Sequence, residues 1–212
     1  MALNKRISLI TISVIFLIYN NCTQNLSGVE TTNGYTVVAS SNSIEGVAPK
    51  FSRVFLFDTS YIPYIGKGLG VVQVADEQGY YSFTCDSGVY NILIVDPLSN
   101  NSGIIKNVTC KNQHSYLESH KGKLKKTGSV SGKIESDSKL KCLVFLSGLD
   151  YHEVVSENES YKFENVPPGE YLLQIILLDS SYSSGFSWGE KVPVLVSSGE
   201  NCVNDFELRI KN

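Results

Sequence analysis

The chain has 212 residues and a formal net charge of −3, and only 18% of its residues are charged. A charge this close to neutral excludes the polycationic surface by which proteins bind nucleic acid. The 12 tyrosines and 17 glycines suit strands and turns better than charged surface helices, so the composition favours an all-β fold.

A short basic and apolar segment opens the chain. Lys5 and Arg6 precede an apolar run from Ile7 to Tyr19. As a helix this run would be about 20 Å long, shorter than the roughly 30 Å core of a bilayer. The pattern predicts a secretory signal, and the alternative is an uncleaved anchor that is lengthened through neighbouring polar residues.

A cysteine, Cys22, stands just after this run. It resembles the lipobox of bacterial lipoproteins, although Tyr19 and Asn21 replace the usual leucine and small residue. The resemblance implies that Cys22 is the lipid attachment site, so that residues 1–22 are a lipoprotein-type signal segment with its anchor cysteine. Ordinary secretion with an unpaired Cys22 is the alternative. Residues 23–34 are small and polar, which predicts a flexible tether.

Two stretches of the remaining chain repeat one another, at residues 72–94 and 154–175. Each contains an apolar strand, an acidic turn, a Tyr-x-Phe strand, a Gly-x-Tyr element and a long apolar strand. Self-similarity on this scale predicts two domains. We expect a first β-sandwich over 35–120, a linker over 121–127 and a second β-sandwich over 128–212.

Alternation and β-branched residues predict seven strands in each domain, which is typical of a β-sandwich of the transthyretin-like or immunoglobulin-like kind. No window supports an amphipathic helix. In the first domain the predicted strands are 35–40, 53–57, 70–75, 80–84, 90–96, 103–110 and 115–119. In the second domain they are 128–135, 142–147, 153–156, 161–164, 171–178, 191–196 and 204–210.

The repeated residues have structural explanations. Gly79 is suited to the positive φ of the first hairpin turn, and Asn158 takes that role in the second copy. Phe83 and Phe163 are expected in the two cores, where truncation to alanine costs about 3–5 kcal/mol.

These residues resemble the carboxypeptidase regulatory-like, transthyretin-like domain. Pro167-Pro168-Gly169-Glu170-Tyr171 carries the likeness in the second copy, and Asp76, Gly79, Tyr81 and Gly88 carry it in the first. The resemblance covers nearly the whole mature chain and implies the fold. It implies little about function, because this module is an accessory domain in unrelated exported proteins.

No catalytic constellation is apparent, and we predict neither enzymatic activity nor a cofactor. His114 and His120 flank Glu118, but their spacing matches no metal motif, so no metal site is predicted either. The carboxylates of the hairpin turns are explained by turn formation.

The sequence therefore predicts a non-catalytic lipoprotein of the cell envelope, anchored at the outer membrane or cell surface, with a structural or protein-binding role. Its expected partners are the membrane and envelope proteins or glycans, and not nucleic acid. The alternative is a carbohydrate-binding module that uses aromatic residues of its loops. Tyr182, Phe186 and Trp188 lie in a segment with small flanks and are the candidate ligand contacts; other aromatic residues in or beside turns are Tyr61, Tyr64, Tyr80 and Tyr151.

Four further cysteines allow three pairings. Strand direction places Cys85 and Cys110 at the same end of the first sandwich, but Cys142 and Cys202 at opposite ends of the second. Because a disulfide requires Cα atoms within about 7 Å, Cys85–Cys110 is the only pair we expect.

Overall fold

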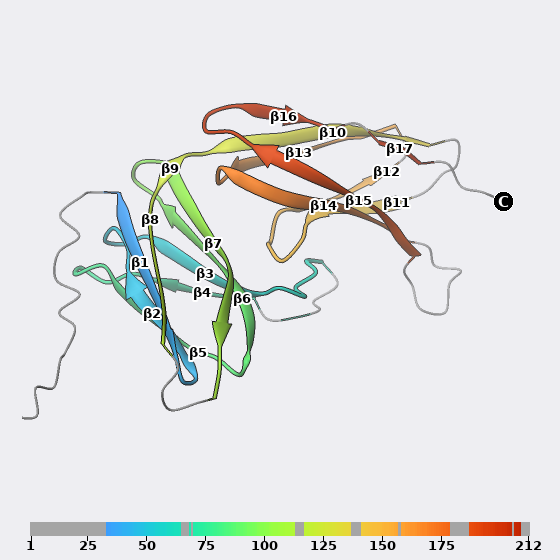
Figure 1. Ribbon diagram of the computed structural model, residues 1–212. Helices are drawn as coiled ribbons and strands as arrows, with labels where there is room; N and C mark the ends of the chain where they lie inside the picture. Colours follow the sequence, from blue (N-terminus) through green and yellow to red (C-terminus); the bar gives the residue numbers. More distant parts are fainter. Residues whose placement is uncertain are drawn as a thin grey trace, which may run out of the picture.

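The computed structural model describes residues 33–64, 68, 70–112, 117–136, 141–156, 158–178, 187–204 and 206–208. Throughout these residues the regular elements are β-strands, which confirms the predicted all-β class. Figure 1 shows two sandwiches, one built from β1 to β9 and the other from β10 to β17. In this part of the chain no helix is long and apolar enough to cross a membrane.

The first sandwich consists of two antiparallel sheets. Their strand orders are β5-β2-β1-β8 and β4-β3-β6-β7-β9, and inward-facing residues such as Ile44, Leu56 and Ile94 form the core between them. The strands are β1 (Gly34–Ser40), β2 (Ser43–Val47), β3 (Arg53–Asp58), β4 (Gly70–Val74), β5 (Tyr80–Thr84), β6 (Gly88–Asp96), β7 (Asn101–Cys110), β8 (Glu118–Lys123) and β9 (Lys125–Lys126).

The second sandwich repeats this plan with a difference at one sheet. Its sheets have the orders β13-β10-β16, with β17 also paired to β10, and β12-β11-β14-β15. In the first sandwich the N-terminal strand β1 runs antiparallel to β2, whereas here the C-terminal strands β16 and β17 run parallel to β10. The strands are β10 (Gly128–Ser136), β11 (Lys141–Leu146), β12 (His152–Ser156), β13 (Ser160–Val166), β14 (Gly169–Leu177), β15 (Ser187–Val196), β16 (Asn201–Val203) and β17 (Phe206–Leu208).

The two predicted hairpin turns form as their residues suggest. Asp76 Oδ1 accepts hydrogen bonds from the backbone N–H groups of Gln78 and Tyr80, and Gly79 has φ 83°. In the second copy Asn158 takes the left-handed conformation with φ 58°, as predicted. Each turn therefore adopts the backbone conformation that its residues favour. The Tyr-x-Phe strand that follows places Phe83 in the first core and Phe163 in the second.

Several predicted boundaries differ from the structure. Strands β2 and β16 were not predicted, and within the range 204–210 predicted for the C-terminal strand the described strand is β17, Phe206–Leu208. The linker expected over 121–127 is wrong, because Lys121 and Lys123 belong to β8, which pairs with β1, and Lys125 belongs to β9. Leu124 between them is only 4% exposed and lies in the first core.

The two sandwiches also share apolar contacts. Leu149, in the β11–β12 loop, is completely buried in a cluster that includes Phe57 and Leu93 of the first sandwich. A second cluster places Ile62 of the β3–β4 loop against Phe145 and its neighbours in the second sandwich. The outer face of the sheet containing β3 and β6 is thus partly covered by the second sandwich.

Candidate functional site

The residues predicted to act at a site are unevenly covered by the structure. Cys22, Tyr182 and Phe186 lie outside the described residues. The backbone of Trp188 lies in β15 opposite Ile176, and its side chain is outside the described part. Their roles therefore stay predictions. The described residues include the disulfide, the remaining loop aromatics and the junction of the two sandwiches.

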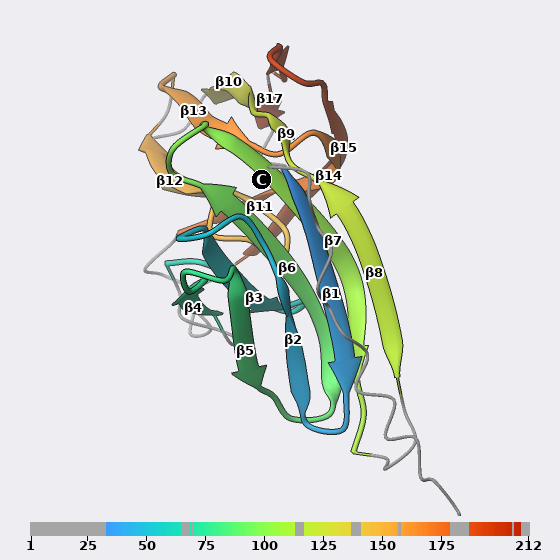
Figure 2. The same ribbon diagram turned by 90° about the vertical axis from the view of Figure 1, so that its left-hand side faces the viewer.

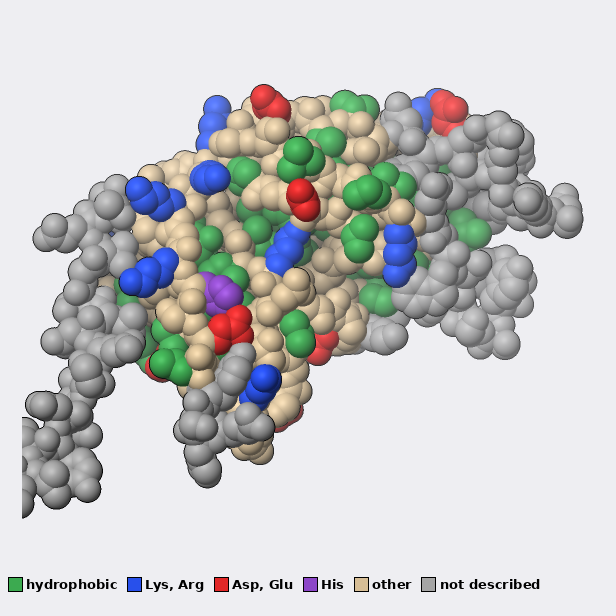
Figure 3. Space-filling model, in the orientation of Figure 1, with side chains coloured by type: hydrophobic (Ala, Val, Ile, Leu, Met, Phe, Trp, Pro, Cys, Tyr) green, Lys and Arg blue, Asp and Glu red, His purple; other side chains and the backbone are tan. Residues whose placement is uncertain are grey.

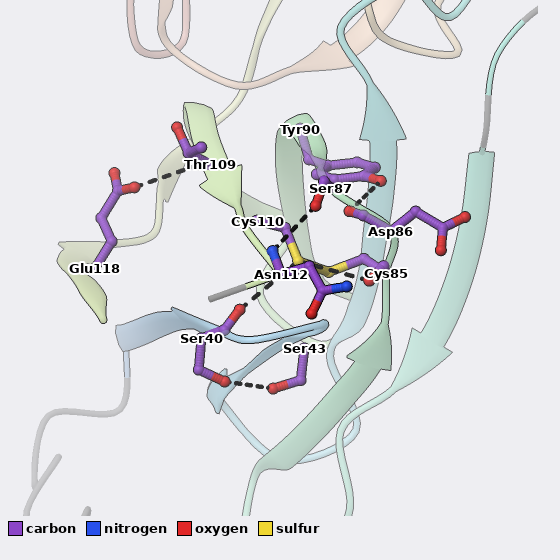
Figure 4. Close-up of a disulfide and its surroundings, with 10 residues drawn as sticks. All are labelled: Ser40, Ser43, Cys85, Asp86, Ser87, Tyr90, Thr109, Cys110, Asn112 and Glu118. Atoms are coloured by element: carbon purple, nitrogen blue, oxygen red, sulfur yellow. Dashed lines mark hydrogen bonds between the residues drawn. A yellow bond between two sulfur atoms is a disulfide. The ribbon is translucent and has the colours of Figure 1, made fainter. Parts of the chain in front are cut away.

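A disulfide joins Cys85 to Cys110, whose Cα atoms are 6.8 Å apart (Figure 4). Cys85 directly follows β5 and Cys110 ends β7, so the bond ties the two sheets of the first sandwich together. Both cysteines are buried. This is a structural crosslink at the end of the sandwich where the β5–β6 connection turns.

The chain around the disulfide is held by hydrogen bonds to the backbone. The Tyr90 hydroxyl donates to the Asp86 carbonyl oxygen at 3.0 Å, and the Asn112 N–H donates to Ser87 Oγ at 3.0 Å (Figure 4). The second sandwich repeats the tyrosine contact, with Tyr171 donating to the Pro167 carbonyl oxygen at 2.6 Å. The Gly-x-Tyr element therefore closes the same turn in both copies.

The two remaining described cysteines are free thiols. Cys142 is buried, and burial raises the pKa of its thiol to about 11, so it is an unreactive core residue at neutral pH. Cys202 is partly exposed.

Most of the described loop aromatics are committed to contacts within the chain. The hydroxyl of Tyr61 donates to Asp150 Oδ1 at 3.1 Å and that of Tyr80 to Glu45 Oε2 at 2.7 Å. The hydroxyl of Tyr151 donates to the Asn165 carbonyl oxygen at 2.8 Å. Tyr64 remains 66% exposed. Three of these four hydroxyl groups are therefore used in hydrogen bonds within the chain.

The histidine pair considered as a metal site is not assembled in the described residues. His120 Nε2 lies 2.6 Å from Glu118 Oε1, a hydrogen-bond contact between residues two positions apart on β8, and His114 is outside the described residues. No group of three or more potential metal ligands occurs in the part of the chain that the structure describes.

A cleft of about 360 Å³ lies where the sandwiches meet. Lys106 Nζ stands 4.0 Å from the centre of the Tyr171 ring and donates to the Glu170 carbonyl oxygen, and burial lowers the pKa of this lysine. Buried Asn91 donates from Nδ2 to the Gly148 carbonyl oxygen at 3.1 Å. Through these contacts Lys106 and Asn91 link the first sandwich to the second at the cleft. We call this region of contact between the two sandwiches the joint.

Sequence reasoning missed this joint. Asn91 and Gln174 interrupt the apolar central strands β6 and β14, yet both are buried. A buried amide in a core strand needs a fixed hydrogen-bond partner. An amide residue within each apolar strand was therefore the feature of the sequence that could have indicated a polar contact there.

Comparisons with known proteins give no family. No protein-family model matches the chain, and no match is found among curated proteins. The Bacillus anthracis TIE protein aligns at 10% identity and a TM-score of 0.26, over 82% of this chain, which spans only 47% of that protein's chain. The major pilin subunit BcpA of Bacillus cereus aligns at 11% identity and a TM-score of 0.24, over 81% of this chain and 70% of its own.

A bacterial adhesin from Mobiluncus mulieris is similar at 10% identity and a TM-score of 0.22, over 85% of this chain and 93% of that chain. TM-scores in this range are too low to support an argument about fold or function.

Proposed function

We propose that the chain is an exported, lipid-anchored protein of a bacterial cell envelope, displayed at the outer membrane or cell surface, with a non-catalytic structural or protein-binding role. The disulfide between Cys85 and Cys110 is the main observation in favour of export from the cytosol. Disulfides persist mainly in oxidising compartments outside the cytosol. It supports the secretory signal between Lys5 and Tyr19.

The anchor in this proposal is Cys22. The first described residue, Asn33, is tied to the fold because its carbonyl oxygen accepts a hydrogen bond from the Leu124 N–H at 2.7 Å. Fully extended, residues 23–32 would reach about 35 Å, enough to hold the first sandwich clear of a bilayer surface. One acyl chain anchors a protein only marginally, so stable anchoring requires the several chains of a mature lipoprotein.

The two sandwiches are assigned in this proposal to carboxypeptidase regulatory-like modules. Support comes from the shared use of the repeated residues, since Tyr90 and Tyr171 each bond to the carbonyl four positions earlier. These contacts explain why the repeat is kept as a structural element. They favour a structural role over an enzymatic one, because the repeated tyrosines make hydrogen bonds that stabilise the fold.

Intact-mass analysis of the protein from native membranes tests the anchor. We expect a mature chain that begins at Cys22 and carries a diacylglyceryl or triacyl increment, and Cys22→Ala should leave the precursor uncleaved or move the protein to the soluble fraction. Cys202→Ala is the matched control, because it removes a partly exposed free thiol elsewhere in the chain. It should change neither processing nor fractionation. Normal processing and membrane retention of Cys22→Ala would exclude lipidation.

Affinity electrophoresis in glycan-containing gels separates the proposed role from the carbohydrate-binding alternative. A structural or protein-binding role predicts unchanged mobility in each gel. Retardation that is lost in Trp188→Ala would instead establish the alternative.

A further inference from the structure

Strand β4 is an open and uncharged sheet edge. Its sequence, Gly70-Val71-Val72-Gln73-Val74, has no ionisable side chain, and every residue of it is exposed, with Val72 at 50% and Val74 at 61%. Among the described strands it pairs with β3 alone. Edges of this kind are templates for pairing with another strand, and native proteins usually protect them.

The free side of β4 presents the main-chain groups of alternate residues. Ala75 exchanges backbone hydrogen bonds with the β3 side, donating to Ser52 and accepting from Phe51. Because these groups alternate along an antiparallel strand, Val72 and Val74 point their N–H and C=O groups away from β3. Within the described part of the chain, these outward groups make no hydrogen bond.

The other edges are protected by charge, proline or shortness. Figure 2 shows β8 on the opposite side of the first sandwich from β4 and β5. There Lys121 and Lys123 point outward, and Figure 3 shows basic side chains gathered over β8 and β9. In the second sandwich β13 carries Lys162 and Glu164, β12 carries His152 and Glu153, β15 carries Pro193, and β16 has three residues.

The neighbouring edge β5 is capped by β4 itself. Gln73 Oε1 accepts a hydrogen bond from the Ser82 N–H at 3.2 Å. The second sandwich has the same device, in which Glu153 Oε2 accepts from the Lys162 N–H at 3.1 Å. Only in the first copy is the capping strand itself without charge, so β4 stays open.

We propose that β4 is the pairing surface for a second copy of this chain, joined as an antiparallel β4–β4 pair with its two-fold axis at Val72. In this register Val72 faces Val72 of the second copy, and Gly70 faces its Val74. All three pairs use the outward main-chain groups, which gives six hydrogen bonds, because each such pair exchanges two. The sheet containing β3 and β6 would continue across both copies.

A second copy suits this edge better than a different strand of the same chain. Apart from β5, which Gln73 of β4 already caps, every other edge would place a charge, a proline or a very short strand against β4, whereas β4 against itself brings no like charges together. Arg53, which pairs with Val74, would fall in line with Phe57 of the second copy and not with its own equivalent. The pairing is closed, since the same patch is used on both copies.

The apolar face also continues into a known interface. Val72 and Gly70 lie on the same sheet face as their partners Phe55 and Phe57. Phe57 is buried against the second sandwich, and Phe55 packs at its margin. Pairing would place the exposed valines of β4 from the two copies side by side on this face, where they contact one another.

Crosslinking of the full chain in native membranes tests the register, and it does so whether or not Cys22 carries lipid. In a Cys202→Ser background, Val72→Cys should give a covalent dimer with a short bismaleimide at yields at least fivefold above Leu195→Cys, an edge position of β15 that is more exposed than Val72. Equal yields at the two positions would overturn the proposal.

A charge exchange tests self-pairing without a crosslinker. Two differently tagged wild-type chains should co-purify, and Val72→Lys should abolish this because two lysines would face each other. Co-expression of Val72→Lys with Val72→Glu should restore it, while each variant keeps the wild-type melting temperature. Failure of the mixed pair, or co-purification of Val72→Lys with itself, would overturn the proposal.

Discussion

Gly46 lies directly opposite Tyr81 in the β2–β5 pair, and the Tyr81 hydroxyl passes over it to donate to the Thr36 carbonyl oxygen at 2.9 Å. A methyl group at Gly46 would lie 2.7 Å from that hydroxyl. The second sandwich repeats the arrangement with Gly132 opposite Tyr161, whose hydroxyl donates at 2.6 Å to the Asn204 carbonyl oxygen. A tyrosine thus links three neighbouring backbone segments in each sandwich.

Removal of the Tyr81 hydroxyl should destabilise the first sandwich. Tyr81→Phe leaves the Thr36 carbonyl without this buried donor, and we expect a loss of about 1–2 kcal/mol in the free energy of unfolding. Tyr80→Phe is the matched control, because its hydroxyl bonds at the surface to Glu45 and its loss should cost less than about 0.5 kcal/mol. Urea unfolding measures both, and equal losses would contradict the distinction.

Buried tyrosines should make the protein sensitive to alkaline pH. Burial raises the pKa of Tyr61 to about 12 and also raises the pKa values of Tyr81, Tyr151 and Tyr171 above the usual value of 10. Above pH 10 the unfolded chain loses tyrosine protons that the folded chain keeps. The free energy of unfolding therefore has its full contribution from these tyrosines below pH 10 and decreases as the pH rises further.

Urea midpoints measured between about pH 8 and 11 should decline only in the upper part of this range. The decline should be shallower in Tyr81→Phe than in Tyr80→Phe. A midpoint that stays constant to pH 11 would show that these hydroxyls ionise without unfolding.

The regular part of the fold could be predicted from local patterns. Alternation located most strands, and the left-handed position of Asn158 followed from the place of the turn. Strand β2 was missed because Glu45 and Gly46 break its short apolar pattern. The lysines of β8 resemble a linker in sequence because an edge strand exposes them, and only pairing with the distant strand β1 shows that they belong to a sheet.

The joint between the sandwiches depends on contacts that no local pattern reveals. Ile62 occupies a loop and Leu149 a turn, positions where an apolar residue is ordinarily exposed, yet both are buried in clusters that contain residues of both sandwiches. The uncharged composition of β4 was visible in the sequence, but its meaning required knowing that the strand lies at an edge.

The disulfide should contribute substantially to the stability of the first sandwich. Cys85 and Cys110 are separated by 25 positions, and closing a loop of this size stabilises a protein by about 3 kcal/mol in the chain-entropy description. Non-reducing peptide mapping should recover this pair, and Cys85→Ser with Cys110→Ser should lower the free energy of unfolding by about 2–4 kcal/mol. A Cys142–Cys202 crosslink would contradict the strand directions.

The last prediction concerns the joint. Because Leu149 is fully buried in the cluster that also holds Phe57 and Leu93 of the first sandwich, Leu149→Ala should cost about 2–4 kcal/mol and lower the melting temperature of the whole molecule in one transition. Leu195→Ala, at a position 63% exposed, is the control and should change stability by less than about 0.5 kcal/mol.

Limited trypsin digestion supplies the second measurement. Lys121, Lys123 and Lys125 lie in paired strands beside buried Leu124, so the wild-type chain should resist cleavage there, and Leu149→Ala should increase cleavage by loosening the joint. Rapid release of two stable halves from the wild-type chain, or two separate thermal transitions of which Leu149→Ala shifts only one, would show that the sandwiches fold as independent bodies.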